Sequence, residues 1–409
     1  YKWVFKDVEA TYKEDHQPGY QEHLPRLIFS TASMNEATSY LMDQFSYELP
    51  ASIEPGVQNI LNGKEKRIDS ILAIQDMVVH HINHFSIPME HKGYNLHSNE
   101  QVLENNGGTT FEKTVLLASI LKKTGFQAQP VAIIPDQFYT EEVGDLHSLE
   151  DYFVKVDHEG NSLYLSAIRD HAYNPRYDRA GDVNMMLNDE SGETRVLNLK
   201  NSISRQHLKG VFTLSPSFLI QGEVTATMTH CENPYLSIEK NEDGAKSILS
   251  PGFPATSVTE HTMEEMNPDE SRIAYTISHT LSPDQQNGYH FVTLPQSRTG
   301  LNNWNLEVLT DERDTPFEIG WPVDIRYQYT IEWPESLELI TENTSIEKEN
   351  EVGSLTIGIQ KDSSSVTVDR HLKIGKSVIP PDQYGSFREM INTWKKDNYR
   401  TLTFKDKEE

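Results

Sequence analysis

The sequence predicts an α+β fold, in which helices and a small antiparallel sheet precede an antiparallel β-sandwich domain with a C-terminal helix. Two observations support this fold class. Between residues 67 and 123, apolar residues recur at steps of three and four, as on one face of a helix. From residue 218 to residue 368, they alternate with polar residues, which is typical of strands with one buried and one wet face.

Length and charge limit the function classes. A chain of 409 residues is long enough for two or three domains. Its net charge of −26 repels phosphate backbones, so we expect no nucleic-acid partner. No apolar run approaches the roughly 18 residues that span a bilayer, and the lone Cys231 excludes an internal disulfide framework. The chain opens on Tyr1 without Met or a secretory signal, so we expect a leader or an upstream domain.

The first half predicts a lead-in followed by a mainly helical region. Prolines punctuate residues 1–50, which we expect to pack on the core as an extended segment with one helix within 35–48. The stripe from Ile68 to Ile82 predicts a helix that begins at Arg67. Two more helices are expected over 98–104, capped by Ser98, and over 110–123, stopped by Gly125; strands over 128–134, 152–157 and 162–166 follow.

The second half predicts an antiparallel β domain. Strands are expected where residues alternate, as over 323–333, and as a hairpin over 355–368. The domain closes with a helix whose apolar face contains Tyr384, Phe387, Met390, Ile391 and Trp394. We therefore expect a lead-in over 1–50, a core domain over 51–205 and a β domain over 206–409. Tyr327 and the tryptophans 304, 321 and 333 are more typical of a core than of a stacking platform for a sugar or peptide.

The segment from Asn105 to Ala128 carries the most specific pattern. It reads Gly107-Gly108-Thr109-Thr110, then Phe111-Glu112-Lys113-Thr114, then an apolar helix that ends in Leu-Lys-Lys-Thr-Gly-Phe-Gln-Ala. This resembles the core motif of transglutaminase-like domains, which runs Gly-Asp-Cys, Lys-Asp-Lys-Ala, and an apolar helix ending in Leu-Arg-x-x-Gly-Ile-x-Ala. Laid on this chain, the motif places its cysteine nucleophile at Thr110.

The resemblance implies a papain/transglutaminase-like core with a degenerate catalytic triad. The strand that carries the family's histidine is best matched by residues 149–156, and the strand that carries its aspartate by residues 162–167. Cysteine, histidine and aspartate then become Thr110, Asp151 and Ser166. A threonine hydroxyl needs a nearby base, an aspartate near its ordinary pKa is a weak one, and Thr110 suits a simple N-cap role.

We therefore expect a non-catalytic protein whose remaining cleft binds a peptide or a glycan without any cofactor. The candidate cleft residues are Gly107, Gly108, Thr109, Thr110, His147 and Asp151. Weaker similarities over Tyr1–Ala10, Phe317–Trp333, Asp369–Leu372 and Tyr384–Trp394 extend the resemblance to an exported transglutaminase-like family of Bacteroidota. That family implies a preceding N-terminal β domain and an exported protein, periplasmic or associated with the outer membrane.

Two alternatives remain open. An altered amidase, peptidase or acyltransferase would use Thr110 with a base such as His147, which lies four residues before the expected histidine position. A metal-dependent hydrolase would use His80 and His84, four residues apart on a predicted helix. Because His81 replaces the glutamate of a metalloprotease signature, exposed helix histidines are the simpler interpretation, and no metal is expected.

Overall fold

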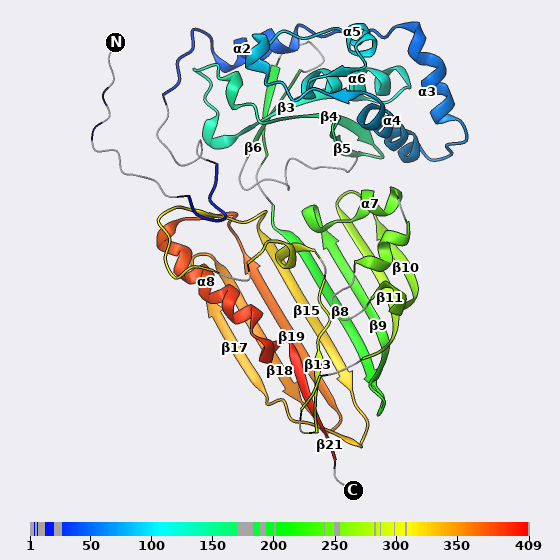
Figure 1. The fold of residues 1–409 in the computed structure, drawn as a ribbon, viewed down its shortest axis with the longest axis vertical. Coiled ribbons are helices and arrows are strands. Elements are labelled where there is room, and N and C mark those ends of the chain that lie inside the picture. Colours follow the sequence, from blue (N-terminus) through cyan, green and yellow to red (C-terminus); the bar gives the residue numbers. More distant parts are fainter. Residues whose placement is uncertain are drawn as a thin grey trace.

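The computed structural model describes residues 4, 6, 13–19, 27–169, 183–188, 194–199, 202–240, 242–248, 254–281, 284–286, 288–297, 299–306 and 309–407. Their arrangement is a mixture of helices and sheets. A smaller part contains a five-stranded sheet with helices, and a larger part is built on an eight-stranded sheet (Figure 1). The predicted α+β class is therefore confirmed at this level. None of the helices in these ranges is long and apolar enough to cross a membrane.

The smaller part places its helices before and beside its sheet (Figure 1). The helices are α2 (Met34–Met42), α3 (Glu54–Leu61), α4 (Arg67–His81), α5 (Asn99–Glu104) and α6 (Thr110–Lys123). The five-stranded sheet has the order β5-β4-β3-β6-β7 and is antiparallel throughout. Its strands are β3 (Ala128–Pro135), β4 (Asp151–His158), β5 (Asn161–Leu165), β6 (Val183–Asn188) and β7 (Thr194–Leu199).

Helix α6 forms the centre of the smaller part. Every residue from Phe111 to Leu121 is buried, and the helix packs on β3 and β4. It stops before Gly125, whose φ of 90° is a left-handed conformation that glycine adopts without steric cost. The predicted helices that begin at Arg67, after Ser98 and at Thr110 are confirmed. The predicted N-cap at Thr110 is wrong, because Thr109 occupies that position.

A short parallel pair lies next to α6. It joins β1 (Asn83–His84) to β2 (Gly107–Gly108). Helix α4 ends at His81, so the prediction that His80 and His84 share one helix face is wrong. Ile82 has an extended backbone, with φ −110° and ψ 121°, and this turns the chain into β1.

The larger part is built on one wide sheet. Its order is β10-β11-β9-β8-β15-β19-β18-β17. The strands are β8 (Ser204–Leu214), β9 (Leu219–Thr229), β10 (Val258–Met266), β11 (Glu270–Thr280), β15 (Val323–Glu332), β17 (Thr344–Glu349), β18 (Gly353–Lys361) and β19 (Ser365–Ile374). The predicted hairpin over 355–368 is confirmed as β18 and β19. The prediction of an entirely antiparallel domain is wrong at the centre, where β8 and β15 pair in parallel.

A second layer covers the apolar face of this sheet. It contains helix α8 (Pro381–Lys395) and a four-stranded sheet of order β12-β13-β21-β16 (Figure 1). These strands are β12 (Asp284–Gln286), β13 (Tyr289–Thr293), β16 (Leu337–Leu339) and β21 (Thr401–Asp406). The predicted closing helix is confirmed, and its five apolar residues are buried. Strand β21 was not predicted, because its mixed sequence lies beside a charged tail. The described residues of the larger part also form β14 (Phe317–Glu318), β20 (Val378–Ile379) and α7 (Tyr235–Lys240), together with short 3₁₀ helices.

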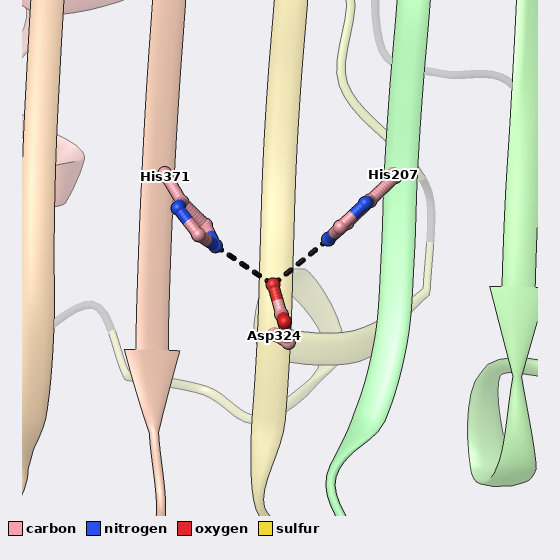
Figure 2. A group of neighbouring side chains, drawn as sticks. All are labelled: His207, Asp324 and His371. Atoms are coloured by element: carbon pink, nitrogen blue, oxygen red, sulfur yellow. Dashed lines mark hydrogen bonds and ion pairs between the residues drawn. The ribbon is translucent and has the colours of Figure 1, made fainter.

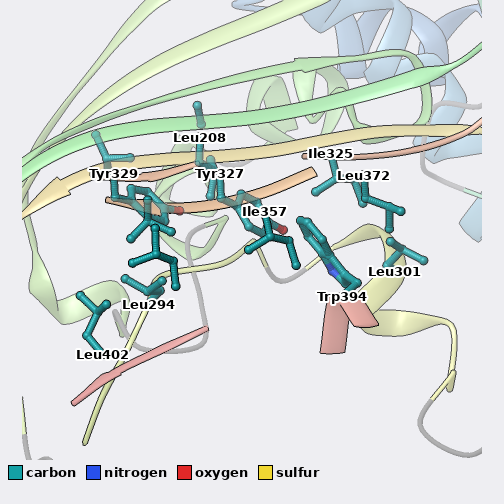
Figure 3. Packing of buried hydrophobic residues seen from close by; sticks show 14 of the residues in the cluster. Leu208, Leu294, Leu301, Ile325, Tyr327, Tyr329, Ile357, Leu372, Trp394 and Leu402 are labelled. Atoms are coloured by element: carbon teal, nitrogen blue, oxygen red, sulfur yellow. The ribbon is translucent and has the colours of Figure 1, made fainter. Parts of the chain in front are cut away.

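The core of the larger part lies between these layers. Figure 3 shows Leu208, Ile325, Ile357 and Leu372 from the wide sheet facing Leu294, Leu301, Trp394 and Leu402 from the second layer. Tyr327 and Trp333 are buried there, and Trp304 and Trp321 pack against the same cluster. The prediction that these aromatic residues form core rather than a stacking platform is confirmed.

The lead-in divides between the two parts. Helix α2 packs into the smaller part, where Met34, Leu41 and Met42 are buried. Residues 13–19 instead contact the larger part, where Glu14 accepts a hydrogen bond of 2.8 Å from the Thr315 N–H. The prediction that residues 1–50 pack on the core as one lead-in stays a prediction, since residues 1–3, 5, 7–12 and 20–26 lie outside the described residues. The predicted domain boundaries near 50 and 205 stay predictions.

Candidate functional site

The N-terminus of α6 is held by its capping residue. Thr109 has an extended backbone, and the Glu112 carboxylate accepts hydrogen bonds from its N–H at 2.8 Å and from its hydroxyl at 2.9 Å. Glu112 also accepts from the His97 N–H at 2.8 Å and forms an ion pair with Lys92. Thr109 therefore occupies the N-cap position and is held there by Glu112, while Thr110 is the first residue of the helix.

Strand pairing brings a histidine to Thr110. Because β1 pairs with β2 in parallel, His84 lies beside Gly108, and the Phe85 N–H donates to the Gly108 carbonyl at 2.9 Å. A Cβ atom on Gly107 would lie 2.3 Å from the Phe85 ring, so glycine allows this close approach. The Nε2 atom of His84 lies 3.0 Å from the Thr110 hydroxyl.

The surroundings of His84 favour its neutral form. Burial, and secondly the charge of Lys113, lower the pKa of the imidazole. Lys113 is itself 1% exposed and donates to the Ile82 carbonyl at 2.7 Å and to the Val79 carbonyl at 3.3 Å, at the end of α4. Burial lowers the pKa of Lys113 to about 8. A neutral imidazole at hydrogen-bond distance is able to accept the proton of the Thr110 hydroxyl.

A cavity of about 210 Å³ opens beside the start of α6. Its lining is mostly apolar and aromatic, with a few polar groups: Ile87, Pro88, Met89, Glu90, Tyr94, Thr109, Thr110, Phe111, Leu146, His147, Leu149 and Tyr152. His147 belongs to the short 3₁₀ helix Leu146–Ser148, and its Nδ1 atom lies 3.6 Å from the Glu90 carboxylate. Of the six candidate cleft residues, Thr109, Thr110 and His147 line this cavity and Gly107, Gly108 and Asp151 do not, while the imidazole bonded to Thr110 is that of His84.

Asp151 and Ser166, which the resemblance matches to the other two triad positions, form hydrogen bonds elsewhere. Asp151 begins β4, is 9% exposed and accepts a hydrogen bond of 2.9 Å from the Tyr152 N–H. Ser166 follows β5, and its hydroxyl accepts from the N–H groups of Ile168 and Arg169 at 3.2 Å each. Neither residue is in the lining of the cavity. Their assignment to former catalytic positions stays a prediction from resemblance.

Sequence reasoning missed two features of possible function. The first is the pairing of His84 with Thr110, because the helical spacing from His80 to His84 concealed the helix end at His81. The second is a group with metal-ligand geometry formed by His207, Asp324 and His371, the one such group of three among the residues that the structure describes. These three residues are far apart in the sequence, so only the strand register reveals them.

Comparison with known proteins agrees with this architecture. Residues 286–404 match the model of a domain of unknown function that has a solved structure, DUF3858. The matched residues include α8, β15, β17, β18 and β19, so they supply one half of the wide sheet and much of the second layer.

A solved structure resembles nearly the whole chain. It is the crystal structure of a protein from Parabacteroides distasonis ATCC 8503 described as a "putative protease", with a TM-score of 0.63 and 18% sequence identity. The match covers 98% of this chain and 64% of that chain, so the present chain spans less than two thirds of its length. No curated protein matches. The resemblance therefore shows that nearly the whole chain shares the fold of the matched part of that protein, and at this identity it shows the fold alone.

Proposed function

We propose that the chain binds an extended peptide in the cavity at the start of α6 and does not cleave it. The observation that carries this proposal is that the cavity contains Thr110 and His147, while Asp151 and Ser166 are engaged in backbone hydrogen bonds outside its lining. Papain-like catalysis needs a nucleophile, a base and an orienting group in mutual contact. A site that only binds a peptide needs a cavity of suitable shape and hydrogen-bond donors that face it.

The lining favours a peptide over a glycan. Ile87, Leu146 and Leu149 offer an apolar surface for a side chain, and the first turn of α6 has N–H groups without intrahelical partners. Such groups favour a carbonyl or carboxylate oxygen. An apolar side chain next to a carbonyl group is the repeating chemistry of a peptide, whereas glycan recognition commonly uses an exposed aromatic face, and the candidate platform in the larger part is buried.

Peptide titration of a cavity-filling variant tests this proposal. Leu146→Trp is expected to narrow the cavity and weaken binding of an apolar peptide pool, measured by calorimetry, by at least about tenfold. Leu61→Trp makes the same exchange in a separate cavity beside α3 and is expected to leave the affinity unchanged. Mass spectrometry is expected to recover the peptides intact. Equal affinities of the two variants, or cleavage that disappears in Thr110→Ala, contradict the proposal.

A second candidate function rests on the hydrogen bond between His84 and Thr110. In an altered acyltransferase or hydrolase, His84 Nε2 would take the hydroxyl proton while Thr110 Oγ1 attacks a carbonyl carbon, and the imidazolium would then protonate the leaving group. An activated ester tests this directly. Accumulation of a Thr110-linked acyl group, lost in His84→Ala and kept in His80→Ala, would favour the enzyme over the binding protein.

We also propose that the native protein is exported and associated with the periplasm or outer membrane. The support is the resemblance of its motifs to an exported Bacteroidota family, together with the Bacteroidota structure that shares its fold. Fractionation of cells that express the complete gene tests the proposal. Recovery in the cytoplasmic fraction alone would contradict it.

A further inference from the structure

Three polar side chains converge on the solvent-facing side of the wide sheet. They come from the adjacent strands β8, β15 and β19, and Figure 2 shows His207 and His371 pointing at Asp324 from either side. The register explains this arrangement, because His207 and His371 are both paired with Arg326, two residues beyond Asp324 on the same face. The side chains of His207 and His371 are therefore directed along the strands toward the carboxylate of Asp324.

The two imidazoles converge on one atom. Nε2 of His207 and Nε2 of His371 each lie 2.8 Å from Oδ1 of Asp324, and the two rings are nearly perpendicular, at 87°. One atom from each of the three residues lies within 4.8 Å of the other two. Two imidazole nitrogens and one carboxylate oxygen form the donor set of many zinc and non-haem iron sites, in which three protein ligands leave positions open for water or substrate.

The site is partly sheltered and firmly supported. The side chains of His207, Asp324 and His371 are 32%, 13% and 22% exposed, so solvent reaches the cluster from one side. Strand β15 is paired over ten residues with each of its neighbours, which fixes the three Cα positions before any ligand binds. This pre-organisation lowers the entropic cost of binding an ion.

Neighbouring charges leave the ligand atoms accessible. Arg326 donates to both carboxylate oxygens of Asp369, at 3.0 and 2.6 Å. The charge of Arg326 is therefore paired with Asp369 and not with Asp324. Lys373 lies 3.6 Å from Oδ2 of Asp324, the oxygen that the imidazoles do not contact. Because Lys373 is 45% exposed, it is able to move into solvent when a cation approaches.

We propose that His207, Asp324 and His371 bind a divalent transition-metal ion of the zinc class. Neutral imidazoles need only move their proton from Nε2 to Nδ1 to present two lone pairs to the ion, and Asp324 supplies the third ligand and one negative charge. Imidazole ligands favour zinc, copper, nickel or iron over magnesium and calcium. Since His207 precedes the matched DUF3858 residues 286–404, the site requires both halves of the wide sheet.

Metal titration of the full chain tests this proposal. After treatment with a chelator, the protein is titrated with Zn²⁺ against a chromophoric competitor, and with Co²⁺ to record the absorption of its ligand field. We expect one ion per chain, and affinity lowered by at least about 100-fold in His371→Gln, His207→Gln and Asp324→Asn, because outer partners alone commonly contribute 10–100-fold. Thermal unfolding with chelator present checks that each variant is folded.

A matched histidine separates this site from general surface binding. His261→Gln changes a histidine on β10, the edge strand of the same sheet, and is expected to keep the wild-type affinity and Co²⁺ spectrum. Absence of stoichiometric binding in the wild type overturns the proposal. So does equal loss of affinity in His261→Gln and His371→Gln, or retention of wild-type affinity in all three cluster variants.

Discussion

The Nε2 atom of His84 lies 3.0 Å from the hydroxyl of Thr110, although the sequence suggested His147 as the nearest base for an altered enzyme. The contact depends on the parallel pairing of β1 with β2, which places His84 beside Gly108 at the start of α6. In papain-like sites, the helix N-terminus and an imidazole that takes up the thiol proton activate a cysteine at the first position of a helix. Here a threonine occupies the first position of α6.

Thr110→Cys is expected to create a reactive thiol. The helix N-terminus and the neighbouring His84 imidazole should lower the thiol pKa from about 8.5 into the range of about 3.5–7.5. Alkylation of this cysteine at pH 7, followed by mass spectrometry, is then at least about tenfold faster than that of the half-buried Cys231 in the same chain. Adding His84→Ala should slow it, and equal rates at both cysteines would contradict this assignment.

Glu112→Gln is expected to destabilise the smaller part in a pH-dependent way. Burial raises the pKa of Glu112, but hydrogen bonds from Lys92, His97 and Thr109 outweigh burial and leave the pKa below its ordinary value. The ionised carboxylate therefore raises the free energy of unfolding at pH values above the pKa of glutamate in the unfolded chain, about 4.3. This contribution is lost as the pH falls through the lower pKa that Glu112 has in the folded protein. In urea unfolding, the free energy of unfolding of Glu112→Gln should be about 1–3 kcal/mol lower than that of the wild type at pH 7. This difference should become smaller below a pH of about 4.

The control for this pH dependence is Glu100→Gln, an exposed position in the first turn of α5. It is expected to change the free energy of unfolding by less than about 0.5 kcal/mol. A constant difference between Glu112→Gln and wild type from pH 7 to pH 3 would show that the side chain acts through shape and not through charge.

Gly353→Ala is expected to disturb β18, while Gly358→Ala in the same strand is not. A Cβ atom at Gly353 would lie 1.9 Å from the Lys373 carbonyl oxygen, whereas at Gly358 the nearest atom is 3.9 Å away. Because the backbone must shift only for Gly353→Ala, we expect this variant to lose about 1–3 kcal/mol of the free energy of unfolding. Gly358→Ala is expected to lose less than about 0.5 kcal/mol. Chemical unfolding of both variants measures this, and equal losses would be evidence against the close approach.

Arg370→Met is expected to be tolerated better than Arg370→Ala. Arg370 is 1% exposed, its guanidinium lies 4.2 Å from the Trp394 ring centre, and burial lowers its pKa to about 10. Methionine fills a similar space without the cost of a buried charge, so Arg370→Met should change the free energy of unfolding by less than about 1.5 kcal/mol. Alanine leaves a cavity, so Arg370→Ala should lower the free energy of unfolding by about 3 kcal/mol. Thermal unfolding compares them, and a methionine variant as unstable as the alanine variant would show that the charge is essential.

Local sequence patterns predicted much of the fold because they depend on where an element begins and ends and on which of its faces is buried. The capping sequence at Ser98, the glycine after α6 and the alternation of residues along β15 each depend on neighbours only a few positions away. The same reasoning failed where distant strands decide. Strand β21 is stabilised by β13 and β16, and the parallel pairing of β8 with β15 joins segments more than 100 residues apart.

The sequence by itself determined the α+β class and the helix that begins at Thr110. The assignment of a cleft to Thr110 and His147 stays a prediction, although both residues line one cavity. Only the tertiary structure decided that His84 is hydrogen-bonded to Thr110, and that His207 and His371 meet at Asp324. The physical reason is register: a shift of one residue in any of these strand pairs turns each side chain to the opposite face, and local sequence does not specify which distant strand is paired.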